Sequence, residues 1–576
     1  MKIGLQNFQG IGAYTEIPIA PITLFYGQNS AGKSTVADAF EFLSETLSGE
    51  NEEWRKDLSR HARRNRKDRQ LTTGYIGEPE DVVFLVSSYI SGQSDTWNFV
   101  TRRGYVDPEQ FFQINAGLRE LFDDAECAVY AGVYAEYRII FREYDGCWKV
   151  QETLLSIDGM PLFKRQLGER VHGYDNILLS FNPYHPRYRR FDEAQWQPSF
   201  QIVIKKFFHT ELVGLDEHGW ITLQTYCHPS HHRDEFSDSP FDWGDVYYEG
   251  KFNGTDNVGL EDLFRKVIEM LEFFMVIPAI SAARSCSLET VPPIREIPPK
   301  HATYQATSSR SNCWEQLASD IRYIKHGCTH KASSWLDFLN EMLGSRDFLN
   351  TGYKVSGDMS VSVDIDELNR IFKFNKSERK QAVENLPYVV HPYIVCQPEN
   401  YHVEIADVGV GISQVIPVLY GCWIIGQCGG VHIQQPELHL HPKLQAQLAD
   451  VFIKCVNAED TTGETTYKFS GHFLLESHSE HLLLRILRRI RESHATKSTQ
   501  AEMPAGSGAV VNLNKIRERH LTADQVSVVY VSKDENGITQ LKPLRLNDDG
   551  EFLDRWPDGF FTERDRELFG DEDPFA

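Results

Sequence analysis

The chain has 576 residues, of which 41% are hydrophobic, and it carries a formal net charge of −23. A chain of this length can bury a large core and is expected to hold two or more domains. The negative charge predicts overall repulsion from nucleic acid, so that any contact with nucleic acid requires a local basic patch. The ten cysteines include no C-x-x-C pair. This pattern argues against a zinc ribbon or a disulfide framework and predicts free thiols in a cytoplasmic protein.

No segment has the features of a signal peptide or of a membrane span. Residues 1–7 lack an apolar stretch followed by a cleavage site. The longest mostly apolar run, residues 415–426, is too short to cross a bilayer and contains Pro417. The sequence therefore predicts no membrane insertion.

Residues 2–26 alternate short apolar runs with turns and predict a small β element whose last strand, residues 22–26, is buried. The residues that follow fit the phosphate-binding pattern G-x-x-x-x-G-K-[ST]: Gly27, Gln28, Asn29, Ser30, Ala31, Gly32, Lys33, Ser34 and Thr35. Residues 36–43 then have apolar side chains at helical spacing, so a helix N-terminus would point at bound phosphates. In such a loop the backbone N–H groups cradle phosphates, Lys33 reaches the β/γ-phosphates and the Ser34 hydroxyl ligates Mg²⁺. We therefore predict ATP and Mg²⁺ as ligands.

Basic residues crowd into residues 55–69. They are Arg55, Lys56, Arg60, Arg63, Arg64, Arg66, Lys67 and Arg69. One interpretation is a solvated face balanced by acidic neighbours. The other is a contact with nucleic-acid phosphates or with an acidic partner.

Residues 49–257 are rich in aromatic side chains and form an insertion of unknown role, with strand-like pieces such as residues 137–141. No heptad repeat runs through the insertion, which excludes a long coiled-coil arm there. Residues 258–384 are expected to be a helical and connector region. Its predicted helices are residues 260–271, 314–324 and 335–343. Its polar residues 292–312, with prolines and serines, are expected to form a mobile connector.

A second informative region begins after strand-like pieces at residues 388–390, 393–395 and 402–405. Gly409, Gly411, Ser413 and Gln414 form a Gly-x-Gly-x-Ser-Gln turn that is expected to feed a helix beginning near Val415. Closely spaced glycines allow the backbone to approach a ligand, and Ser413 would present its hydroxyl and amide at the helix N-terminus.

Two further strands are predicted to end in polar side chains. Residues 431–437 form a short β run ending in Gln434, Gln435 and Glu437, and Pro442 is well placed to begin the next helix. Residues 471–479 form a buried strand that ends near His478 and is followed by a helix over residues 483–490. In open α/β sheets, ligands lie at the carboxyl ends of the strands, where these polar residues fall.

Together these motifs resemble the ATP-binding-cassette (ABC) heads of SMC-like and RecF-like ATPases. Their order is the phosphate loop, the Gly-rich signature, the strand ending in P-E-L-H-L-H-P and the strand ending in S-H-S. The chain is most similar to prokaryotic AAA family ATPases of anti-phage defence, including the PtuA-like ATPase subunits of Septu-type and retron-associated systems. These share the P-E-L-H-L-H-P strand and a block like residues 556–561. The resemblance covers residues 1–45 and about 385–565.

The resemblance implies an α/β fold with a split ABC-ATPase head, a mixed sheet with flanking helices. Residues 1–48 and 385–565 would form the head, which is interrupted by the aromatic-rich insertion and by the helical segment. It also implies a dimer around ATP, in which Ser413 reaches the γ-phosphate bound to the second subunit and His478 is the switch histidine. Hydrolysis in this class requires both halves, because it works by positioning and charge stabilisation.

The chain departs from this pattern at the two positions that normally carry carboxylates. The resemblance makes Ser34 and residue 434 the Mg²⁺ ligands and makes residue 435 the group that orients or deprotonates the attacking water. Here both strand positions are amides, Gln434 and Gln435. An amide oxygen is a poorer Mg²⁺ ligand than a carboxylate and cannot act as a general base. Three explanations stay open: a slow ATP sensor, partial replacement by Glu437, or an engineered glutamine that traps ATP. ATP hydrolysis is therefore uncertain.

No nuclease centre is visible, and the roughly sixty residues after Ala509 are too few for a nuclease domain. The function implied is that of an ATP-bound dimer that controls a separately encoded nuclease in anti-phage defence. The alternative is a RecF-like, ATP-gated DNA-repair clamp without a nuclease partner. The basic helix face of Arg485, Arg488, Arg489 and Arg491 is expected to be solvated or at an interface. The block at Trp556 is expected either to dock a partner or to complete the fold.

Overall fold

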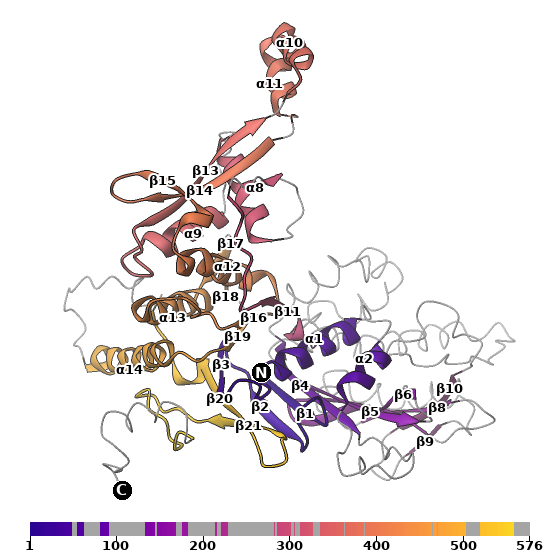
Figure 1. The fold of residues 1–576 in the computed structure, drawn as a ribbon. Helices are drawn as coiled ribbons and strands as arrows, with labels where there is room; N and C mark the ends of the chain where they lie inside the picture. Colours follow the sequence, from indigo (N-terminus) through magenta and orange to yellow (C-terminus); the bar gives the residue numbers. More distant parts are fainter. Residues whose placement is uncertain are drawn as a thin grey trace, which may run out of the picture. The chain divides into compact units, whose positions relative to one another are not determined.

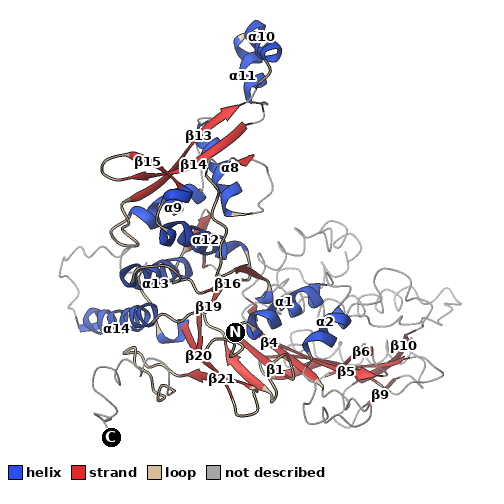
Figure 2. Cartoon of the chain, in the orientation of Figure 1, coloured by secondary structure: helices blue, strands red, loops and turns tan. Residues whose placement is uncertain are grey.

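The computed structural model describes residues 1–48, 54–62, 81–90, 133–144, 147–168, 175–182, 213–215, 221–227, 282, 285–300, 304–305, 312–325, 334–361, 363–384, 386, 388–462, 465–468, 471–502 and 519–557. Sheets and flanking helices alternate along these residues (Figure 2), which confirms the predicted mixed α/β class. The chain forms two compact units. The first comprises Met1–Ile19, Gln28–Leu288 and Val531–Pro543, and the second comprises Ala20–Gly27, Glu289–Tyr530 and Leu544–Ala576.

A nine-stranded sheet dominates the first unit, in the order β2-β1-β4-β5-β6-β7-β8-β10-β9. Its strands are β1 (Lys2–Gln6), β2 (Thr15–Pro18), β4 (Val82–Ile90), β5 (Val133–Tyr144), β6 (Cys147–Ile157), β7 (Met160–Leu167), β8 (Asp175–Phe181), β9 (Val213–Leu215) and β10 (Ile221–Cys227). Every pairing in it is antiparallel, with Ile3 opposite Ile17 on one side and opposite Val86 on the other. The strand expected at residues 137–141 is part of β5. Strands from the predicted insertion thus extend a sheet that starts at the N-terminus.

Helices α1 (Thr35–Ser48) and α2 (Trp54–His61) accompany this sheet. The predicted apolar face of α1 is confirmed, because Val36, Phe40 and Leu43 are fully buried. Phe42 of α1 stacks on Phe84 of β4, with ring centroids 5.4 Å apart. These aromatic contacts fix the helix that follows the phosphate loop.

The second unit contains a sheet with the strand order β11-β16-β19-β3-β20. These strands are β3 (Ile22–Gly27), β11 (Leu288–Val291), β16 (Gly430–Gln434), β19 (His472–Glu476) and β20 (Val526–Lys533). β19 runs parallel to both β16 and β3, with Glu476 opposite Gln434 on one side and opposite Phe25 on the other. The carboxyl ends of three strands therefore meet at one sheet edge. β20 leads by a turn into β21 (Thr539–Leu544), which lies mostly in the Val531–Pro543 segment of the first unit.

The remaining helices of this sheet region are α12 (Val410–Ile424), α13 (Pro442–Val456) and α14 (Glu480–Glu502). One core joins them to the strands, since Val415, Phe452 and Leu483 are buried in the same cluster as Ile433 and Phe473. Pro442 begins α13, as predicted.

A smaller sheet and more helices complete the second unit (Figure 1). They are α8 (Cys313–Lys325), α9 (Trp335–Gly344), α10 (Ile365–Lys373), α11 (Lys376–Glu384), β12 (Tyr304–Gln305), β13 (Tyr353–Val361), β14 (Tyr388–Cys396) and β15 (Tyr401–Glu404). α8 and α9 confirm two predicted helices. The pieces predicted at residues 388–390 and 393–395 are one strand, β14, in which Pro392 lies opposite Gly357 of β13. α10 and α11 follow at the end of the β13–β14 ribbon, where Ile365 and Phe372 are exposed.

The expectation of a mobile connector over residues 292–312 is wrong for its described part. Residues 292–299 have no helix or strand, but Arg295 is buried and hydrogen-bonded, and Tyr304–Gln305 pair with β14. The polar composition therefore reflects a built-in contact.

Several other expectations can be placed. Trp556 packs edge-on against Phe552, with ring centroids 4.9 Å apart, and also contacts Tyr26 and Tyr530. This aromatic cluster confirms fold completion as its role. The helix predicted at residues 260–271, the basic residues after residue 62 and residues 558–561 lie outside the described residues. Of the helices that the structure describes, none is long and apolar enough to cross a membrane.

Candidate functional site

The loop at residues 27–35 begins at the end of β3 and leads into α1. Its backbone enters the left-handed region at Gly27 (φ 146°), Ser30 (φ 61°) and Gly32 (φ 102°). Nζ of Lys33 donates to the carbonyl oxygen of Gln28 at 3.0 Å, so the lysine folds back across the loop. The loop thus already has a compact turn with an ammonium group held over it.

Two residues outside the motif hold the loop within the first unit. Gln9 links the start of α1, since it accepts from Oγ1 of Thr35 at 2.9 Å and donates to the Asp38 carboxylate at 2.7 Å. Oγ1 of Thr539 donates to the carbonyl oxygen of Ala31 at 3.0 Å. A Cβ on Gly32 would lie 2.8 Å from the same Thr539 oxygen, so this position requires glycine. The sequence analysis missed Gln9 and Thr539, because no motif spacing connects them to the loop.

The signature turn differs from its predicted form. α12 begins at Val410 with Gly409 as its N-cap, and Ser413 and Gln414 therefore lie inside its first turns. The Ser413 side chain is buried, and its hydroxyl donates to the Val410 carbonyl oxygen at 3.0 Å. The exposed part of the turn is Gly409 and Val410. A Cβ on Gly411 would lie 2.6 Å from the carbonyl oxygen of His439, which explains the second glycine.

Arg295 connects the signature helix to the end of β16. The Gln414 side chain donates to the Arg295 carbonyl oxygen at 2.8 Å. The Arg295 guanidinium in turn donates to the carbonyl oxygens of Gln434 and Gln435 at 2.8 and 3.0 Å. Burial lowers the pKa of Arg295 to about 10, so it remains protonated at neutral pH. A buried cation of this kind costs desolvation and fixes the groups that satisfy it.

Glu437 forms a clasp between two strand ends. Its carboxylate accepts from the backbone N–H of His478 at 2.6 Å and from the Ser477 hydroxyl at 3.0 Å. Burial raises the pKa of Glu437, although these hydrogen bonds and the charge of Arg295 oppose the shift. Glu437 therefore positions the backbone at His478, whose side chain is half-buried.

The two amides at the end of β16 have different surroundings. Gln435 has a left-handed backbone (φ 46°), and its N–H donates to the Glu476 carbonyl oxygen at 2.8 Å. Nε2 of Gln434 lies 3.4 Å from Oε1 of Glu476. The same Glu476 oxygen lies 2.7 Å from Nε2 of His432, whose Nδ1 is 3.4 Å from the Thr290 hydroxyl. A buried carboxylate thus faces the Gln434 amide across the strand pair.

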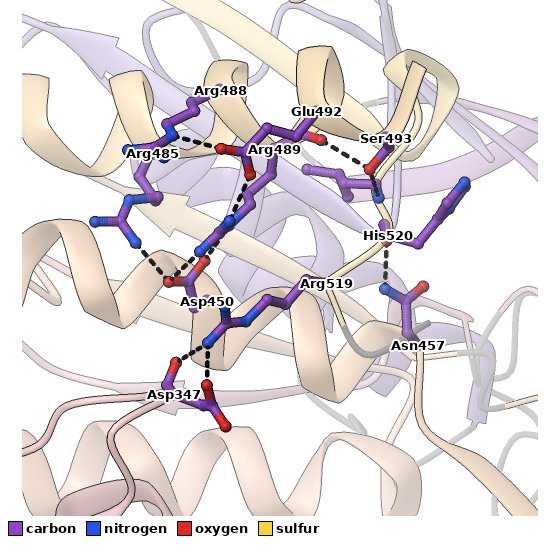
Figure 3. Close-up of polar contacts among 11 residues, drawn as sticks. Asp347, Asp450, Asn457, Arg485, Arg488, Arg489, Glu492, Ser493, Arg519 and His520 are labelled. Atoms are coloured by element: carbon purple, nitrogen blue, oxygen red, sulfur yellow. Dashed lines mark hydrogen bonds and ion pairs between the residues drawn. The ribbon is translucent and has the colours of Figure 1, made fainter. Parts of the chain in front are cut away.

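Nearby charged residues have structural roles. Arg485 and Arg489 of α14 both bind the carboxylate of Asp450 on α13, at 2.7 Å each, and Asp450 is 2% exposed (Figure 3). Arg488 pairs with Glu492 at 2.6 Å. Arg519 donates to the carbonyl oxygen and the carboxylate of Asp347, at 2.8 and 2.9 Å. The helix face predicted to be solvated or at an interface is an internal helix–helix interface for Arg485 and Arg489.

Within the described residues, no group of three or more His, Cys, Asp or Glu side chains could hold a metal ion. The Mg²⁺ ligands expected from sequence, Ser34 and Gln434, are of other residue types, and each lies next to a nucleotide motif. All the cysteines in the described part of the chain are free, as predicted: Cys147, Cys286, Cys313, Cys396, Cys422, Cys428 and Cys455.

Comparison with known proteins gives three findings. Residues 521–569 match a family model described as "Protein of unknown function (DUF3696)". No curated protein matches the sequence. The structure is similar to an Smc head bound to the C-winged helix domain of ScpA, with a TM-score of 0.34, 9% identity and coverage of 95% of this chain and 97% of that chain.

Two further solved structures are similar. One is the Smc head domain with an extended coiled coil bound to the C-terminal domain of ScpA from Pyrococcus furiosus, with a TM-score of 0.31 and 10% identity. It covers 94% of this chain and 96% of that chain. The other is the SMC head domain from Thermotoga maritima, with a TM-score of 0.29, 8% identity and coverage of 95% and 98% of the two chains.

Proposed function

We propose that the chain is an SMC-like ABC-type ATPase head that binds ATP at residues 27–35. The observation that carries this proposal is the conformation of the loop. A buried strand leads into it, left-handed residues turn it, Lys33 folds across it, and a helix of fourteen residues starts directly after it. A helix N-terminus behind exposed backbone N–H groups favours anionic phosphates.

The donor set suits a magnesium nucleotide. Mg²⁺ binds oxygen ligands and usually keeps several waters beside phosphate oxygens, so the Ser34 hydroxyl is a suitable ligand and the Gln434 amide oxygen a weaker one. When bound, Mg²⁺ would neutralise charge on the phosphates. Lys33 would hold the β/γ-phosphates, while Arg295 and Glu437 fix the backbone of residues 434, 435 and 478. The assignment of residues 1–48 and 385–565 to one head belongs to this proposal.

The ATP-dependent dimer is part of the same proposal. Gly409 and Val410 expose the N-terminal turn of α12, and nothing lies within 4 Å of a Cβ built on Gly409. An exposed turn of this kind can dock against a nucleotide held by a second copy. In this arrangement Ser413 would reach the γ-phosphate after its hydroxyl leaves the Val410 carbonyl oxygen, and His478 would face that phosphate.

The effector assigned by the resemblance is a separately encoded nuclease in anti-phage defence. Part of the basic stretch supports this assignment over a DNA clamp, because Arg55 donates to the Trp148 carbonyl oxygen and Arg60 pairs with Asp57. These two guanidinium groups therefore have partners within the chain.

Nucleotide binding tests the core of the proposal. We expect Lys33→Ala to weaken ATP binding about 10- to 100-fold, the loss of a charge-assisted hydrogen bond, whereas Lys56→Ala, at an exposed lysine, binds normally. Equal ATP affinity for all three proteins would contradict the proposal. Turnover of the unmodified chain is expected to be slow, because neither Gln434 nor Gln435 can accept a proton.

Association tests the finer assignments. We expect ATP to convert the monomer to a dimer in light-scattering measurements, and Lys33→Ala to remain monomeric. Co-purification with a nuclease subunit would support the defence assembly. DNA-stimulated turnover with strong salt dependence and no nuclease partner would instead indicate the clamp.

A further inference from the structure

The β16 strand lacks a carboxylate, yet a carboxylate is present at the same sheet edge. Glu476 is the last residue of β19, directly opposite Gln434 in the parallel register. Its side chain is on the same face of the sheet as those of Gln434 and His432, since Oε1 contacts both side chains. The missing charge has therefore moved one strand along.

The position of Glu476 relative to the phosphate loop follows from the sheet and the chain. β19 lies between β16 and β3, and Glu476 pairs with Phe25 of β3. Gly27 ends β3, and Gln28 is the next residue in the chain. Glu476 is thus at the carboxyl edge of the strand pair from which the loop departs, the usual ligand position in open α/β sheets.

Glu476 is also oriented, as a functional carboxylate must be. It is 7% exposed. When Nε2 of His432 carries the proton, it donates to Glu476 at 2.7 Å, and Nδ1 accepts from the Thr290 hydroxyl at 3.4 Å. Such an outer partner fixes the direction of a ligating carboxylate.

Glu437, the other acidic candidate, is occupied differently. Its two oxygens accept from the His478 N–H and the Ser477 hydroxyl, at 2.6 and 3.0 Å. A carboxylate that holds two strand ends in this way is a positioning group for the backbone.

We propose that Glu476 supplies the carboxylate of the magnesium-nucleotide site in place of residue 434, with Gln434 as its neutral neighbour. A glutamate at both positions would put two carboxylates within hydrogen-bond distance of each other, and like charges this close cannot both ionise easily. The amide at 434 is then the complement of the acid at 476. This inference rests on the proposed ATP binding and goes beyond it by naming the carboxylate.

Exchanging the two residues tests the idea. The full chain is titrated with Mg²⁺ in the presence of a slowly hydrolysed fluorescent ATP analogue, and the Mg²⁺ concentration for half-maximal binding is measured. We expect Glu476→Gln to raise this midpoint about tenfold or more. The double exchange Gln434→Glu/Glu476→Gln keeps one acid and one amide, and its midpoint is expected to stay within about threefold of the unmodified chain.

The exchange also keeps the inference testable if Glu476→Gln does not fold. If Glu476 were not used, the double exchange would introduce the first carboxylate into the site and lower the midpoint about tenfold. That result, or an unchanged midpoint for a folded Glu476→Gln protein, would overturn the proposal. Glu341→Gln, at an exposed residue that pairs with Lys454, controls for the loss of one negative charge.

Failure of the inference is distinguishable from failure of nucleotide binding. Loss of analogue binding in Lys33→Ala together with an unchanged midpoint in Glu476→Gln refutes only the role of Glu476. Binding that is independent of Lys33 refutes the ATP site itself.

Discussion

The phosphate loop and the sheet edge of the second unit are built by different means. Gly27 and Gly32 shape the loop through its backbone, and neutral hydrogen bonds from Gln9 and Thr539 support it. At the sheet edge, by contrast, Arg295, Glu437 and Glu476 are buried and hold three strand ends and a helix through charged groups. Substitutions in the loop should therefore change ligand affinity, whereas substitutions at the sheet edge should first change the free energy of unfolding.

The largest expected effect is that of Arg295→Ala. It removes the donor of two carbonyl oxygens and a charge beside buried Glu437, and breaking a buried charged contact of this kind costs about 3–5 kcal/mol. Urea unfolding followed by tryptophan fluorescence measures the loss. Arg346→Ala, at an exposed arginine, should unfold like the unmodified chain. If Arg295→Ala unfolded normally but bound ATP weakly, the contrast between the two regions would be wrong.

Such contrasts explain what could be predicted from sequence. The loop could be predicted because its glycines are constrained by the backbone and appear at fixed spacing. β3, α1, β16, β19 and the start of α13 followed from apolar runs bounded by polar residues. Arg295 and Glu476 could not be assigned, because the value of a buried charge depends on partners from distant segments. The polar composition around Arg295 even suggested a mobile connector.

Buried ionisable groups should also make the second unit sensitive to pH. Burial lowers the pKa of His472, at the start of β19, from 6.5 to about 4. Between these values the unfolded chain binds a proton that the folded chain does not, so stability falls as pH falls from 6.5 to 4. The loss is about 3 kcal/mol in all.

A neutral side chain at this position isolates the effect. His472→Gln should lose less stability than the unmodified chain when urea unfolding is compared at pH 6.5 and pH 4.5. Parallel pH dependence in the two proteins would show that other groups cause the acid sensitivity.

A pair of glycines in the signature turn gives a matched, smaller effect. Gly411→Ala places a Cβ 2.6 Å from the His439 carbonyl oxygen, and overpacking of this kind costs about 1–3 kcal/mol. Gly409→Ala meets nothing within 4 Å and should cost less. Both are measured by thermal unfolding and by ATP-dependent dimer formation. Equal destabilisation by the two alanines would refute the close contact as the reason for the second glycine.

The smallest effect sharpens the comparison from the loop side. Thr539→Val removes the hydroxyl that donates to the Ala31 carbonyl oxygen but keeps the volume of the side chain, a loss of about 1 kcal/mol. Because this bond holds the loop, the loss should appear as about a fivefold weaker ATP affinity. Thr539→Ser keeps the hydroxyl and should bind ATP almost normally. Equal weakening in valine and serine would assign the role of Thr539 to packing against Gly10 and Gly32, and the loop would then depend on side-chain packing as the sheet edge does.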